Sequence, residues 1–79
     1  MYVDTPQRWR TTAAAAARAT LAARWHSVVR ALHAAELEYR ALYAAETIDI
    51  RALRKAARRI DDLSHLRAVL AAELGAPPA

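Results

Sequence analysis

Cysteine is absent from this chain, and glycine and proline together supply only four of its 79 residues. Without cysteine there is no disulfide and no thiolate metal site. A domain of this size must therefore gain its stability from helix packing or from association. Pro6, Gly75, Pro77 and Pro78 lie near the two ends, so nothing between residues 7 and 74 breaks a helix through its backbone. Alanine and arginine dominate the chain, and both favour helices. The composition therefore predicts an all-α fold.

The chain also has no long apolar run and no glycine-rich segment. A membrane-spanning helix needs about 18 or more apolar residues in sequence, so we expect no membrane span, no secretory signal and a cytoplasmic location. Ser27 and Ser64 have no glycine elbow and no converging histidine and carboxylate. The sequence thus predicts that the protein is not an enzyme, with no cofactor and no small-molecule substrate.

Three histidines are the remaining candidates for metal ligation. His26 and His33 are seven residues apart, too far along one helix to share an ion. His33 with Glu36, and Asp62 with His65, have the three-residue spacing of a chelating pair, but no matching motif completes a four-ligand site. We therefore expect exposed polar histidines and no bound metal.

An apolar rhythm with alternating steps of four and three residues runs through the first half of the chain. This spacing puts the residues on one seam of an α-helix, as at the a and d positions of a coiled coil. The seam consists of Leu21, Trp25, Val28, Leu32, Ala35, Tyr39 and Leu42.

Two helices joined by a short turn are expected. Thr47 and Asp49 can each cap a helix N-terminus, and Gly75 suits a helix C-terminus. A single long helix stays an alternative, because the break contains neither glycine nor proline. The predicted order is an N-terminal arm at 1–10, a helical hairpin at 11–75 and a tail at 76–79. Within the hairpin, the helices are expected near 11–46 and 50–74, with the turn at 47–49.

The apolar positions of the second helix cover a broad arc, because their spacing tightens to three residues after Ile60. So wide a stripe can contact more than one neighbouring helix. We therefore expect an antiparallel, coiled-coil-like hairpin, completed into a bundle by self-association (a homodimer or a higher oligomer) or by a partner protein. The expected core and interface residues are Leu21, Trp25, Val28, Leu32, Tyr39 and Leu42, with Leu53, Ile60, Leu63, Leu66, Leu70 and Leu74.

Charge is arranged in blocks, within a net charge of +4. An acidic block at 36–50 is followed by a purely basic block at 51–60, and a hairpin would fold one against the other. The basic block can simply form a solvated face of the helix. Alternatively, it can contact nucleic acid or an acidic partner. The candidate contact residues are Arg51, Arg54, Lys55, Arg58 and Arg59, with Arg8, Trp9 and Arg10 of the arm.

These features favour a non-catalytic helical protein–protein interaction module, a small structural or accessory subunit or an assembly factor of a larger complex. The first helix is longer than the second, so residues 11–20, with five consecutive alanines, form an overhang that could receive a partner or remain exposed. The alternative function is a small basic nucleic-acid-binding protein that uses the arginine-rich face of the second helix.

Overall fold

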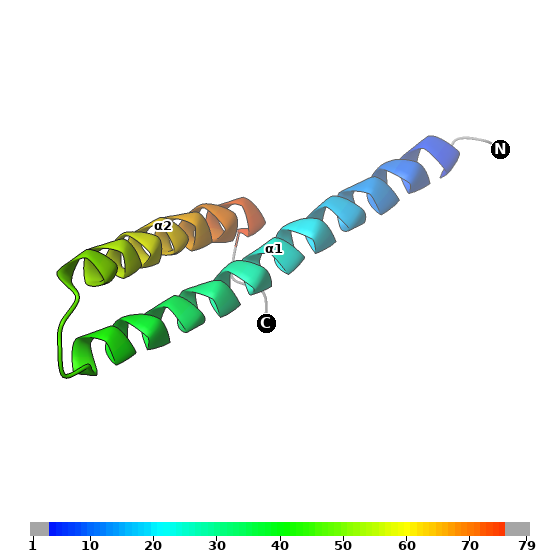
Figure 1. The fold of residues 1–79 in the computed structure, drawn as a ribbon. Helices are drawn as coiled ribbons and strands as arrows, with labels where there is room; N and C mark the ends of the chain where they lie inside the picture. The colour runs from blue at the N-terminus through cyan, green and yellow to red at the C-terminus, as the bar shows by residue number, and fades with distance from the viewer. Residues whose placement is uncertain (1–3, 76–79) are drawn as a thin grey trace.

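Two antiparallel helices form the whole of the described fold (Figure 1). The computed structural model describes the backbone of residues 4–75 and the side chains of residues 12–75. Helix α1 spans Asp4–Ala44 and helix α2 spans Ile50–Leu74, and the two pack along one side of each other. The molecule is a rod of 72 × 16 × 15 Å. The all-α hairpin is confirmed over these residues, and the single long helix is excluded.

Helix α1 begins earlier than the sequence suggested. Its first residue is Asp4, whereas an arm was expected over residues 1–10. Pro6 falls in the first turn, where its missing N–H would have had no partner within the helix. No helix-breaking residue follows it over 7–17, so the helix that was expected to begin near residue 11 extends back to Asp4.

The connection between the helices is short and has a definite cap. Helix α1 ends at Ala44, two residues before the expected end, and a bent segment leads to Asp49. The Asp49 backbone is extended (φ −90°, ψ 100°), and its Oδ1 accepts a hydrogen bond from the Ala52 N–H at 3.0 Å. The backbone N–H of Leu53 donates to the Asp49 carbonyl at 3.0 Å. Asp49 is therefore the N-cap that starts α2, as its position predicted.

Helix α2 ends on a left-handed glycine. Gly75 has φ 82°, and its N–H donates to the carbonyl of Ala72 at 3.2 Å. Arg18 of α1 reaches across and donates from Nη1 to the carbonyl of Leu74 at 2.9 Å. This bond satisfies one of the last carbonyls of α2, which have no partner inside the helix. It also marks where α2 ends against α1.

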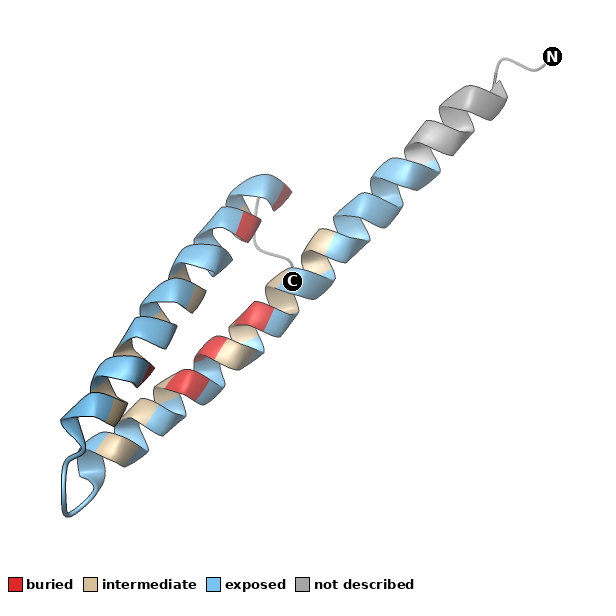
Figure 2. Ribbon diagram, turned by 45° about the horizontal axis from the view of Figure 1, so that its top comes forward, coloured by how far each residue is buried: buried red, intermediate tan, exposed pale blue. Residues whose placement is uncertain are grey.

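The buried residues lie along the sides of α1 and α2 that face each other (Figure 2). None of the described side chains is less than 2% exposed, so the hairpin has no enclosed interior. The other seam residues, including Trp25 and Tyr39, are half-buried. The residues that are buried are Val28, Leu32, Ala35, Ala56, Leu70 and Leu74.

The apolar stripe of α2 leaves the helix contact as it proceeds. Leu53, Ile60 and Leu63 are half-buried, but Leu66 is 44% exposed. Each step of three residues turns a helical stripe by about 60°, so two such steps from Ile60 carry Leu66 onto the flank of the hairpin. The expected contact of Leu66 with the seam is thus only partial. Ala56, which was not among the predicted core residues, is buried, whereas its neighbour Ala57 is half-buried.

Candidate interaction surfaces

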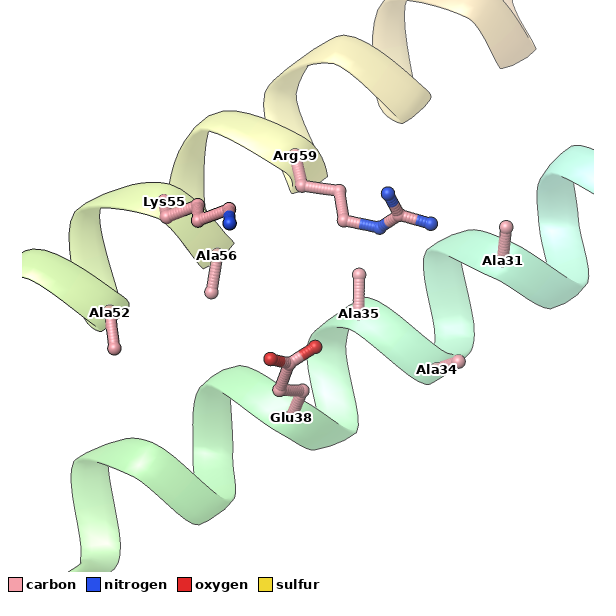
Figure 3. Close-up of a pocket in the computed structure, with 8 residues that line it drawn as sticks. All are labelled: Ala31, Ala34, Ala35, Glu38, Ala52, Lys55, Ala56 and Arg59. Carbon is pink, nitrogen blue, oxygen red and sulfur yellow. The ribbon is translucent and has the colours of Figure 1, made fainter.

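A groove runs along one side of the hairpin, between α1 and α2 (Figure 3). Its volume is about 510 Å³, and its lining holds five alanines with no hydroxyl or imidazole group. Because the alanine side chain ends at Cβ, the alanines next to the seam leave this space between α1 and α2. We call this feature the alanine groove; it is lined by Ala31, Ala34, Ala35 and Glu38 of α1 and by Ala52, Lys55, Ala56 and Arg59 of α2.

The rim of the alanine groove is mostly basic. Lys55 and Arg59 extend from α2 over the groove, and Glu38 rises from α1 between the alanines (Figure 3). All three side chains are exposed. The groove therefore offers an apolar floor with two positive charges on its α2 side and one negative charge on its α1 side.

An exposed apolar ridge follows the groove along α2. Leu66 is 44% exposed and Val69 is 40% exposed. Leu66 lies two helical turns beyond Arg59 and therefore on the same face of α2 as the groove rim. Exposed carboxylates flank the two apolar side chains at four-residue spacing, Asp62 before Leu66 and Glu73 after Val69. We call Asp62, Leu66, Val69 and Glu73 the α2 ridge.

The basic residues in the first half of α2 are exposed. All five side chains predicted there are exposed: Arg51, Arg54, Lys55, Arg58 and Arg59. Four of them, all but Arg59, line a shallow depression of about 250 Å³ that no acid borders. A second depression of about 310 Å³ adjoins it and includes Asp62 and Leu63. The face is thus continuously cationic over its first two turns and becomes mixed at Asp62.

Helix α1 extends beyond the end of α2. Residues 12–20 are exposed, including the alanines from Ala13 to Ala17, and among them Arg18 hydrogen-bonds to α2. Within this overhang the Thr20 hydroxyl donates to the carbonyl of Ala16 at 3.0 Å, a bond inside its own helix. The side chains of Arg8, Trp9 and Arg10, predicted to contact a partner, lie outside the described residues.

Of the described aromatic side chains, Trp25 and Tyr39 are half-buried on the seam, as predicted, whereas Tyr43 beside it is exposed. Tyr39 stacks on Tyr43, with ring centroids 6.4 Å apart and 18° between planes, and Tyr43 itself is 64% exposed. Trp25 meets His26 edge-on at 5.3 Å. The Trp25 Nε1 is buried and has no hydrogen-bond partner. An unpaired buried donor costs about 1–3 kcal/mol, so packing rather than polar contact holds this indole in place.

The histidines stay apart from one another. His33 and His65 are exposed, as predicted, but His26 is half-buried because its ring packs against Trp25. Over the part of the chain that the structure describes, no three histidine or acidic side chains come together as metal ligands would. Over the same part, neither helix has a stretch long and apolar enough to cross a membrane.

The alanine groove was not predicted from the sequence. The heptad rhythm identifies which residues face the other helix, but it does not show how much space alanine leaves beside that contact. The signal was present in the alanines that flank the seam on both helices, such as Ala31, Ala34 and Ala52. Val69 was missed for a similar reason, because it follows the drift of the stripe onto the flank rather than the seam.

Comparison of the chain with models of protein families, with curated proteins and with solved structures finds no match in any of the three.

Proposed function

We propose that this protein is a non-catalytic helical interaction module, a small structural or accessory subunit or an assembly factor of a larger complex. The observation that carries the proposal is an apolar surface that the hairpin leaves uncovered. Leu66 and Val69 are exposed beside a groove floored by alanines. Adjacent exposed apolar side chains and an apolar groove within a polar rim are typical of protein–protein contact sites.

The shape of the chain supports the same proposal. Only six of its described residues are buried, and none of the described side chains is less than 2% exposed. A hairpin with so thin a core gains stability if a partner covers part of its exposed apolar surface.

The experiment is recovery of the tagged protein from the cells that make it, followed by native mass spectrometry. Three forms are compared: the natural chain, Leu66→Asp, and Leu37→Asp as the matched control. Leu37 is 50% exposed on α1, and its side chain does not line the groove. We expect an assembly larger than one chain that Leu66→Asp removes and Leu37→Asp keeps. A single-chain mass for all three forms would contradict the proposal.

A second candidate function is nucleic-acid binding by the exposed basic face of α2. The observation that favours it is the depression bordered only by Arg51, Arg54, Lys55 and Arg58. Phosphate contacts release counterions, so such binding weakens steeply as salt increases. Arg54→Glu with Arg58→Glu should abolish binding, and the control reversal of Arg30 and Arg40, exposed on α1, should weaken it far less. Absence of binding at low salt would rule this function out.

A further inference from the structure

The alanine groove and the α2 ridge are complementary to each other. The ridge presents two apolar side chains, Leu66 and Val69, between the carboxylates of Asp62 and Glu73. The groove presents an alanine floor, and its α2 rim carries the amine of Lys55 and the guanidinium of Arg59. An apolar ridge with an acidic border thus matches an apolar groove with a basic border.

The two surfaces cannot meet within one chain, because both lie on α2. The four groove residues of α2 centre near Ala56, and Leu66 lies ten residues farther along, or about 15 Å. Each surface is therefore available to a second molecule, and any second copy of the chain carries both.

We propose that the occupant of this face is a second copy of the chain, which docks antiparallel along α2. A two-fold axis that crosses α2 near Asp61 places the ridge of each copy in the groove of the other. Such a contact is isologous and closes at two chains. The inference rests on the proposed function, because it names the partner of the same uncovered surface.

Charge along α2 sets the direction of the pair. Residues 51–60 carry five positive charges and no acid, whereas residues 61–74 carry three acids and one arginine. A parallel pair would place one basic block beside the other. An antiparallel pair places each basic block beside the acidic half of the other copy, with Asp62 near Arg59 of the second copy. Such complementarity fixes orientation more than it adds affinity.

The pair covers both surfaces of each copy, because each copy contributes one ridge and one groove to the contact. The resulting assembly has four helices, two from each copy. In it, Leu66 occupies the position of a knob that packs between the helices of the facing hairpin.

The first test is sedimentation equilibrium of the purified full chain and of three variants. Leu66→Asp alters the ridge, and Ala34→Glu alters the groove at an exposed position that the hairpin contact does not use. Leu37→Asp is the control. We expect twice the 8.7 kDa chain mass for the natural chain and the control. Because each change occurs twice in a pair, both groove and ridge variants should weaken association by at least about 100-fold.

Circular dichroism of each variant shows whether the helices are retained. A single-chain mass for the natural chain at about 100 µM would overturn the inference, although the proposed function would still stand if the cellular assembly contained another protein. A two-chain mass that survives both Leu66→Asp and Ala34→Glu would place the contact elsewhere and also overturn it. Masses that grow beyond two chains would contradict the closed pair.

The second test measures the register of the pair, and the lack of natural cysteine makes it direct. One preparation carries Leu66→Cys and another carries Ala34→Cys, and each is treated with a short bifunctional maleimide alone and after mixing. The proposed pair brings residue 66 of one copy beside residue 34 of the other and holds the two copies of residue 66 far apart. We expect rapid cross-linking only in the mixture. Equal cross-linking of Leu66→Cys alone would overturn the register.

Discussion

Replacing Leu32 with alanine tests whether the seam stabilises the hairpin. Leu32 is 3% exposed and lies in the middle of α1, between Val28 and Ala35 of the same seam. The substitution removes about three buried carbon groups, at about 0.8 kcal/mol each, and leaves a small cavity. Because no described neighbour is fully enclosed, the helices can partly close that cavity. We expect a loss of about 3 kcal/mol in the free energy of unfolding.

The assay is urea unfolding followed by circular dichroism, at one fixed chain concentration because association would shift the midpoint. Leu37→Ala is the matched control: Leu37 is 50% exposed, so its loss should change stability by no more than about 0.5 kcal/mol. If the Leu32→Ala chain is unfolded even without urea while the Leu37→Ala control is folded, that also counts as the expected result. A loss below about 1 kcal/mol, or equal losses in both variants, would refute the reasoning.

Three further substitutions test the helix ends, the first two by the same unfolding assay and the third by hydrogen exchange. Asp49→Ala removes the hydrogen bond to the Ala52 N–H and should cost about 1 kcal/mol; an unchanged midpoint would mean that the cap is not used. Gly75→Ala places a Cβ at φ 82°, with open space around it, so strain alone should cost about 1 kcal/mol, and a stabilised protein would contradict this. Arg18→Leu removes the bond to the Leu74 carbonyl, and hydrogen exchange should then speed up in the last turn of α2 and not in its first.

The helical hairpin was predictable because local signals agree with one another. The rhythm from Leu21 to Leu42 gives the buried side of α1, and Asp49 and Gly75 give the two ends of α2. Each of these signals acts over a few residues, through side-chain spacing or a cap, and so can be read from the chain itself. The start of α1 was placed too late because Thr11 also resembles a helix start, although the helix continues back to Asp4.

The interaction surfaces were only partly predictable, because they depend on the relative placement of two helices. The exposed basic face of α2 follows from helical spacing alone, and all five of its side chains are exposed in the structure. The alanine groove requires the register of α1 against α2, which brings Ala35 and Ala56 into the lining of one groove. No local pattern gives that register. The exposure of Leu66 depends on it too, because its neighbours on α1 decide how far it is covered.

The central claim is that the hairpin is completed by a second copy, and the concentration dependence of thermal unfolding tests it most directly. A protein that unfolds from a pair of chains gains about 1.4 kcal/mol for each tenfold increase in concentration. For two chains of this length the unfolding midpoint should rise by about 3–6 °C for each tenfold step. A midpoint that stays constant from about 2 to about 200 µM would contradict the claim.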